Sequence, residues 1–307
     1  MKAIHLRANT RTEIEAQISK VLRGLGTPEP PLHLDDVRLL LRLDRNYYSS
    51  RDDSVLRESV SRLKIAGQQV ISRPTLLLEA ISKLSLRALY LPDKRRILID
   101  ADLPVLKHRW NEAHEIGHSV IPWHQGLMGD DELTLTPSCH YKIEAEANFA
   151  AGQLLFFGTR FIEEAKSLKP GFQAVTSLTK TFGNTKTSTL WRYVEQVGAE
   201  LPLFGMISCH PHVLRRDDSF NPENPCRHLV QSEAFVARFG SLSEKTLFGK
   251  VASHCGAQRG GFIGEEDIVL QDLNGVDHLF HFETFFNQHD ALTLGVYLRP
   301  VRLSLAS

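Results

Sequence analysis

The 307 residues include 36 lysines and arginines and 36 aspartates and glutamates, so the formal net charge at pH 7 is zero. This balance argues against DNA binding and excludes a chain that is strongly basic as a whole. Hydrophobic residues make up 42% of the chain, which suffices for two or three globular units. No apolar run reaches the length of a membrane span, about 18 residues, and we identify no signal peptide. The four cysteines are scattered along the chain. We therefore expect a cytoplasmic protein in a reducing compartment, with no membrane partner.

The first 50 residues predict a helical extension. Ile14, Ile18 and Val21 recur at helical spacing, and a proline-rich break at residues 28–31 separates this helix from a second one near residues 34–43. The stretch 53–70 is amphipathic and basic and is expected to form a solvated face over the core. Residues 86–91 and 96–100 then predict a β-hairpin that turns at Pro92-Asp93.

Residues 114–118 read His-Glu-Ile-Gly-His inside a helix that Pro122 is expected to end. Histidines four residues apart share one helix face, so His114 and His118 can bind one metal ion with Glu115 beside it. This pattern is typical of zinc peptidases, in which the carboxylate handles the protons of the attacking water. The alternative is an amphipathic helix with two incidental histidines.

A catalytic zinc takes three protein ligands, and two residues are candidates for the third. His124 follows His118 by six residues, as in H-E-x-x-H-x-x-G-x-x-H enzymes, but Ile121 stands where those enzymes have the glycine of the turn. Glu144, on a second predicted helix that ends at Leu155, is therefore favoured.

The second helix carries a stripe of small residues below Glu144, formed by Ala147 and Ala151. Small side chains on this face are expected to let the helix approach Gly117 of the first helix closely. Glu146 is expected to point elsewhere, into solvent.

The two helices together resemble the ImmA/IrrE-type metallopeptidases, whose pattern is a short strand, A-H-E-x-x-H, and a helix reading E-x-x-A-N-x-F-A-x-x-L-L-x-P. The second helix here reads Glu144-x-x-Ala147-Asn148-x-Ala150-Ala151-x-x-Leu154-Leu155. It departs from the pattern at Ala150, where phenylalanine is usual, and at Phe157, where proline is usual. The resemblance covers about residues 70–200.

The resemblance implies that His114, His118 and Glu144 bind Zn2+ and that Glu115 is the general base. It also implies a protein substrate, namely a cognate helix-turn-helix repressor whose cleavage releases stress-response or mobile-element genes. A donor for the oxyanion is expected as well, and the sequence does not choose among three candidates. These are His124, His140 and Tyr141.

Residues 175–182 and 187–197 predict two short helices across a turn at Gly183, which is a weak helix-turn-helix signature. ImmA/IrrE-like proteins often carry such a segment after the zinc domain. The basic residues that can contact phosphates are Lys180, Lys186 and Arg192. DNA binding and a helical hairpin that packs on the peptidase or grips a protein partner both remain open, because the segment has no dense basic cluster.

After Pro202 the pattern changes to strands, predicted at 203–208, 268–270, 279–282 and 292–298, with a hairpin turn at Asn274-Gly275. We interpret this part as an α+β module with a sensor or interaction role, as in some relatives. A second zinc site is disfavoured here, because no C-x-x-C pair is present. Its candidate ligands would be Cys209, His210, His212, Cys226, His228, His254 and Cys255.

The predicted fold class is α+β, with a mainly helical zincin-like domain that contains a small sheet. The expected domains are the N-terminal extension 1–50, the metallopeptidase domain 51–170, the helix-turn-helix-like segment 171–200 and the C-terminal module 201–307. The favoured function is a zinc-dependent endopeptidase. The alternative is a non-catalytic transcriptional regulator with a structural zinc, and the intact Glu115 favours the peptidase.

Overall fold

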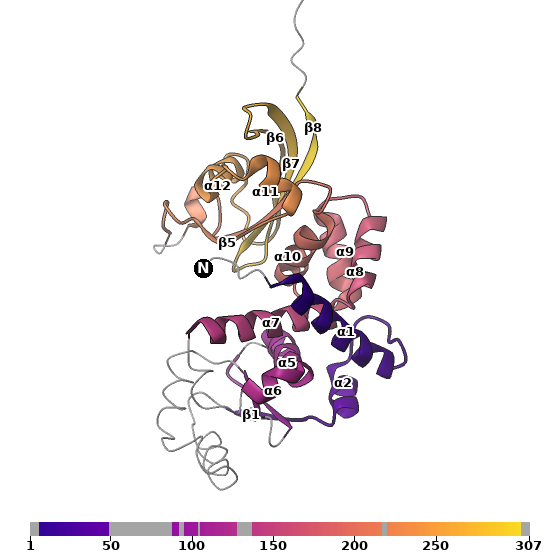
Figure 1. Ribbon diagram of the computed structural model, residues 1–307. Coiled ribbons are helices and arrows are strands. Elements are labelled where there is room, and N and C mark those ends of the chain that lie inside the picture. The colour runs from indigo at the N-terminus through magenta and orange to yellow at the C-terminus, as the bar shows by residue number, and fades with distance from the viewer. Residues whose placement is uncertain are drawn as a thin grey trace, which may run out of the picture. The chain divides into compact units, whose positions relative to one another are not determined.

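The computed structural model describes residues 6–48, 88–91, 95–103, 105–127, 137–216 and 220–301. The predicted amphipathic stretch 53–70 and the predicted turn at Pro92-Asp93 lie outside these ranges. The described chain contains both helices and sheets, so the predicted α+β class is confirmed. It divides into two compact units, residues 1–158 and 159–307, which are described separately below (Figure 1). Among the helices of the described ranges, none has both the length and the apolar character needed to cross a membrane.

The first unit contains a three-stranded sheet in the order β1-β3-β2. The predicted hairpin is confirmed, since β2 (Ala88–Leu91) pairs antiparallel with the buried β3 (Arg96–Asp100). The edge strand β1 (Asp44–Tyr48) pairs parallel with β3 and was not predicted. Its sequence, Asp-Arg-Asn-Tyr-Tyr, lacks the alternation of a half-buried strand, and its partner lies about 50 residues away in the chain.

The first unit also contains five described helices: α1 (Ala8–Gly24), α2 (Leu34–Leu41), α5 (Val105–Val120), α6 (Pro122–Leu127) and α7 (Pro137–Leu155). The predicted N-terminal helices are confirmed as α1 and α2. Helix α5 carries the His-Glu-Ile-Gly-His motif and contacts β2 and β3. It ends before Pro122 as predicted, but this proline then begins α6, a position at which its fixed φ is favourable.

Helices α5 and α7 pack against each other (Figure 1), and Gly117 lies at their contact. A Cβ atom on Gly117 would lie 2.9 Å from the carbonyl oxygen of Ala147 and 3.2 Å from the Cβ of Ala150. Only glycine therefore permits this approach without a backbone shift. The predicted close contact between the small-residue stripe and Gly117 is confirmed, although α7 begins at Pro137 and is longer than predicted.

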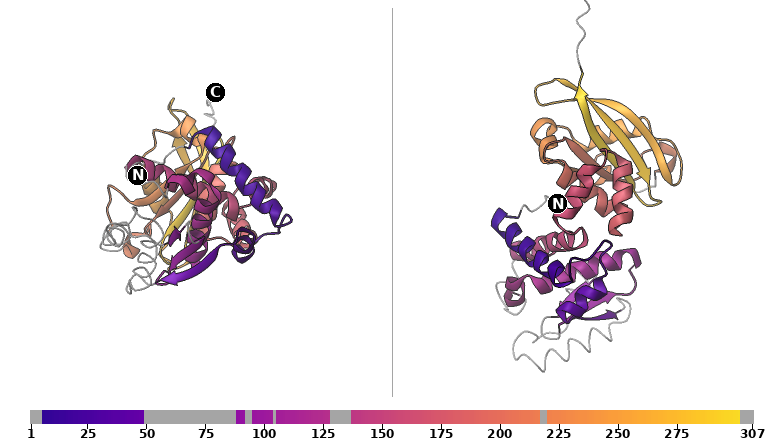
Figure 2. Two further views of the ribbon diagram at one scale, coloured as in Figure 1. Left: turned by 60° about the horizontal axis from the view of Figure 1, so that its bottom comes forward. Right: turned by 90° about the vertical axis from the view of Figure 1, so that its right-hand side faces the viewer.

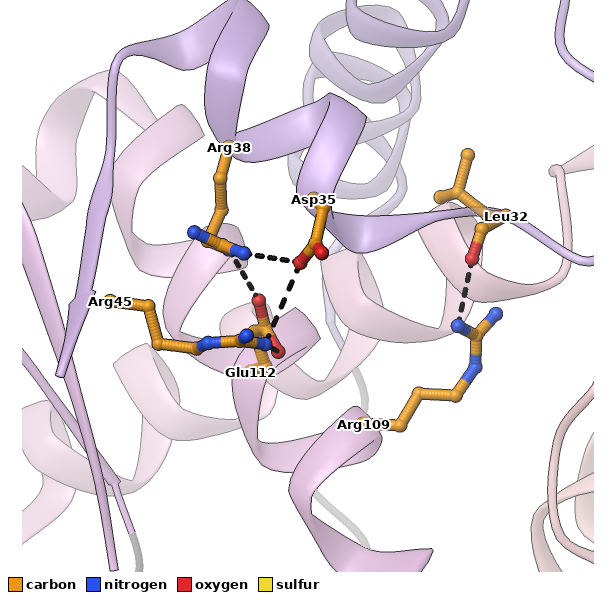
Figure 3. A network of polar contacts seen from close by, with 6 residues as sticks. All are labelled: Leu32, Asp35, Arg38, Arg45, Arg109 and Glu112. Atoms are coloured by element: carbon orange, nitrogen blue, oxygen red, sulfur yellow. Dashed lines mark hydrogen bonds and ion pairs between the residues drawn. The ribbon is translucent and has the colours of Figure 1, made fainter. Parts of the chain in front are cut away.

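A buried carboxylate ties α5 to the N-terminal elements (Figure 3). Glu112, two residues before His114, is only 3% exposed. Its oxygens accept hydrogen bonds from Arg38 Nε on α2 at 2.7 Å and from Arg45 Nη1 on β1 at 2.8 Å. Arg38 also contacts Asp35, whose side chain is 68% exposed. The position of the metal-motif helix thus depends on charges from elements about 70 residues earlier in the chain.

We expect Glu112→Ala to lower the free energy of unfolding by about 3 kcal/mol, because it removes the buried counter-charge of two arginines and leaves them only the exposed Asp35. Chemical denaturation followed by circular dichroism measures this loss. Asp35→Ala is the matched control, and it should cost less than about 1 kcal/mol because that ion pair is solvated. Equal losses in both variants would contradict the structural role of Glu112.

The second unit is built on a five-stranded antiparallel sheet in the order β5-β4-β8-β7-β6. Its strands are β4 (Leu203–Ser208), β5 (Cys226–Gln231), β6 (Gly261–Gln271), β7 (Asp277–Phe286) and β8 (Ala291–Pro300). The right-hand view of Figure 2 shows β6, β7 and β8 as one curved layer. The predicted strands and the hairpin at Asn274-Gly275 are confirmed, whereas β5 was not predicted.

Helices pack on both faces of this sheet. The described helices of the second unit are α8 (Thr159–Ser167), α9 (Phe172–Phe182), α10 (Lys186–Val197), α11 (Glu233–Phe239) and α12 (Glu244–Ala252). On one face, Phe204 and Met206 of β4 share a core with α11 and α12. On the other face α10 lies over Gly205, where a Cβ atom would come within 3.3 Å of Leu190 Cγ.

The predicted helical hairpin is confirmed as α9 and α10. Gly183 ends α9 in the left-handed conformation, with φ of 64°, and the Thr185 side chain caps α10 by accepting from the Ser188 backbone N–H. Because α10 packs on the sheet, Arg192 is buried and cannot contact phosphate, contrary to the prediction. The Lys186 ammonium lies 4.7 Å from the centroid of the Phe285 ring.

Candidate metal centre

Three of the predicted site residues converge between α5 and α7. His114 Nε2 lies 3.1 Å from His118 Nε2 and 3.1 Å from Glu144 Oε2, and His118 Nε2 lies 3.5 Å from Glu144 Oε1. In a tetrahedral zinc site with Zn–N distances of about 2.0–2.1 Å, neighbouring donor atoms are about 3.3 Å apart. The three residues therefore offer donor atoms of the type that zinc binds, at separations close to those of a zinc site.

The charges of these three residues are strongly coupled. Burial by itself would raise the pKa of Glu144, but its contacts with His114 and His118 hold that pKa well below the ordinary value. Burial opposes protonation of His114, yet Glu144 and Glu115 raise its pKa above the usual range. Burial lowers the pKa of His118 to about 4. Near neutral pH the group thus presents an ionised carboxylate and a neutral His118, the forms that bind a metal ion.

The ring nitrogens that face away from the cluster are also engaged. His114 Nδ1 lies 3.1 Å from Asn148 Oδ1, and His118 Nδ1 lies 3.0 Å from His124 Nδ1. Because an amide oxygen only accepts hydrogen bonds, the first contact keeps a proton of His114 on Nδ1. A metal ion would then bind at Nε2, in place of the proton that the contact with Glu144 favours there. Second contacts of this kind orient metal ligands in known sites.

His124 is not placed to be the third ligand. It contacts the ring nitrogen of His118 that points away from Glu144, and its own Nε2 lies 2.9 Å from Glu146 Oε2. Both of its nitrogens are engaged there, so it is not placed to donate to an oxyanion either. Glu146 is 1% exposed, and the prediction that it is solvated is wrong. The other two oxyanion candidates, His140 and Tyr141, have side chains outside the described part of the structure.

Glu115 lies on α5 between the two histidines and is 5% exposed. Burial raises its pKa to about 7; Glu144 adds to this rise, while His114 and a hydrogen bond from the Tyr90 backbone N–H oppose it. The contact with Tyr90 connects this carboxylate to β2, at the edge of the small sheet. A buried carboxyl whose pKa lies near neutrality is suited to accept and return a proton.

From the raised pKa of Glu115 we predict how the stability of the metal-free protein changes with pH. Between the unfolded value of 4.5 and the folded value of about 7, the folded chain binds more protons than the unfolded chain, so this carboxyl stabilises the fold less as pH rises. Glu115→Gln removes this effect. We expect the stability of Glu115→Gln relative to wild type to increase by about 2–3 kcal/mol between pH 5 and pH 8, measured by denaturation in a chelator. If the free energies of unfolding of wild type and Glu115→Gln changed in parallel with pH, the raised pKa of Glu115 in the folded protein would be contradicted.

Other histidines and cysteines do not form a comparable site within the described residues. None of the cysteines of the second unit belongs to a group of three potential ligands among the described residues. A looser group on β6 and β7, not singled out from the sequence, consists of Glu265, His281 and Glu283. Its atoms have protein partners: His281 Nδ1 lies 2.7 Å from Asp267 Oδ1, and Glu283 Oε2 accepts from the Phe172 backbone N–H at 2.6 Å.

Comparisons with known proteins find a likeness among solved structures. No protein-family model and no curated protein matches the chain. Among solved structures, the fold is similar to that of a Mycobacterium tuberculosis transcriptional regulator, with a TM-score of 0.52 and 12% sequence identity. The match covers 94% of this chain and 76% of that chain, so the likeness includes both units. At this identity it concerns the fold.

Proposed function

We propose that this protein is a zinc-dependent endopeptidase that cleaves a regulatory protein of transcription. The observation that carries the proposal is a buried Glu115 beside a three-donor group with zinc-like separations. A purely structural zinc site has four protein ligands and no use for a base, whereas three donors leave one position for the reaction. The resemblance of the two motifs to ImmA/IrrE metallopeptidases supports the same activity.

In the proposed reaction, His114, His118 and Glu144 hold the ion. When bound, zinc would polarise the scissile carbonyl and make water more acidic. Glu115 takes a proton from the attacking water and later delivers it to the leaving amine nitrogen. The Tyr90 N–H and the surrounding burial hold this carboxylate in place, and Asn148 fixes the tautomer of His114.

The second candidate is a non-catalytic transcriptional regulator in which the zinc domain only supports the fold. The name of the structural neighbour, a transcriptional regulator, supports this candidate more directly than it supports proteolysis. In this case α9 and α10 would contact DNA or a repressor. The buried Arg192 argues against DNA, because it removes one of the three basic side chains that can contact phosphates.

A search for new protein N-termini distinguishes the two functions. Purified zinc-loaded protein is added to a cell extract, and N-termini are identified by mass spectrometry with and without a chelator. We expect cleavage within a helix-turn-helix regulator that the chelator abolishes and added zinc restores. No zinc-dependent cleavage, together with DNA retention that weakens steeply with salt, would establish the regulator instead.

A further inference from the structure

A buried row of polar side chains lies behind His118, on the side opposite the metal donors. His118 Nδ1 lies 3.0 Å from His124 Nδ1, and His124 Nε2 lies 2.9 Å from Glu146 Oε2. The same oxygen accepts a hydrogen bond from Trp123 Nε1 at 2.6 Å. His124 is 0% exposed and Glu146 is 1% exposed, so these contacts are formed away from solvent.

Glu146, the last residue of this row, determines which ring nitrogen of each histidine carries a proton. An ionised carboxylate only accepts hydrogen bonds, so Glu146 requires the proton of His124 on Nε2. The Nδ1 atom of His124 then has no proton and can only accept a hydrogen bond. Its partner, the Nδ1 atom of His118, must therefore carry a proton. His118 Nε2 is consequently left with its lone pair directed towards His114 and Glu144. A single arrangement of protons thus satisfies both contacts and prepares His118 as a metal ligand.

Helix α7 contributes to both sides of the His118 ring. Successive residues of a helix are about 100° apart, so Glu144 and Glu146 project in roughly opposite directions. Glu144 approaches His118 Nε2, whereas Glu146 acts on His118 Nδ1 through His124 of α6. The Lys142 ammonium, one turn earlier on α7, lies 3.6 Å from the other oxygen of Glu146 and partly balances its charge.

We propose that His124 and Glu146 are positioning residues that hold His118 in the tautomer and orientation required for zinc binding. This inference rests on the zinc site of the proposed function. It assigns a role to a histidine and a carboxylate that are not ligands themselves. Outer contacts of this kind typically change metal affinity by about 10–100-fold.

The test measures Zn2+ affinity by competition with a chelating dye in the full-length protein. We expect His124→Phe, which removes both nitrogens, to weaken zinc binding by about 10–100-fold. His124→Asn should recover most of the affinity, because its amide oxygen can accept from His118 Nδ1. Glu146→Gln should cause a smaller loss than His124→Phe. Trp191→Phe is the control with near wild-type affinity, because it removes an indole hydrogen bond to Glu195 that has no part in this row.

Two further measurements separate positioning from a general structural role. The absorption spectrum of bound Co2+ should shift in His124→Phe and return towards wild type in His124→Asn, while metal-free unfolding midpoints report stability. Unchanged zinc affinity in His124→Phe, or equal losses in Phe and Asn variants, would overturn the proposal. If His124→Phe does not fold, unchanged affinity in Glu146→Gln would overturn it. A wild type that binds no Zn2+ would overturn the proposed function as well.

Discussion

Glu115→Gln is expected to reduce peptide cleavage by about 10²–10⁴-fold while leaving one zinc per chain. Glutamine has nearly the same shape as glutamate, and Glu115 is not one of the three clustered donors, so the ion should stay in place. Its amide cannot take a proton from water, however, and the step that generates the nucleophile loses its base. The measurement combines the cleavage rate of the identified substrate with the zinc content from elemental analysis.

Glu115→Asp serves as the control for this prediction. It keeps a carboxylate but withdraws it by one methylene group, so it should retain part of the activity that glutamine abolishes. A zinc-loaded Glu115→Gln protein that cleaves at the wild-type rate would sink the assignment of Glu115 as the base. A protein that loses its zinc would instead show that Glu115 contributes to holding the ion.

The local features of this fold were predictable from the sequence. Helix α5 and the stripe on α7 follow from spacings of three and four residues, and the glycine at position 117 indicated where the two helices meet. The antiparallel hairpins also follow from local signals, namely turn residues between apolar runs. For the same reason, the convergence of His114, His118 and Glu144 could be anticipated, since two helix faces determine it.

The features that were missed depend on partners distant in the chain. From the sequence, Glu146 is expected to lie on the surface. In the structure, the short helix α6 places His124 and Trp123 against it. The burial of Arg192 likewise depends on the sheet beneath α10. A charged side chain is normally exposed, and only the tertiary contacts show when it is not. The position of His124, six residues after the motif, indicated that it lies near the metal site. The sequence alone could not show whether it binds the metal or contacts a ligand from the side away from the metal.

Glu144→Ala is expected to weaken zinc binding by about 100-fold or more. Apparent binding free energies of structural zinc sites, about 10–16 kcal/mol for four ligands, correspond to about 3 kcal/mol per ligand. Glu144 is also the only carboxylate among the three donors, and its contacts favour positive charge on both histidines, although burial keeps the pKa of His118 low. Its removal leaves two imidazoles 3.1 Å apart without the carboxylate that contacts both of them.

Competition with a chelating dye measures the loss in Glu144→Ala, and Glu163→Ala, an exposed carboxylate on α8, is the control for a general charge effect. The control should bind zinc like wild type. If Glu144→Ala also binds zinc like wild type, the third ligand lies elsewhere, and the undescribed segments 49–87 and 128–136 become the places to search for it. A specific loss would instead establish that α5 and α7 together form the metal centre, as the close approach at Gly117 requires.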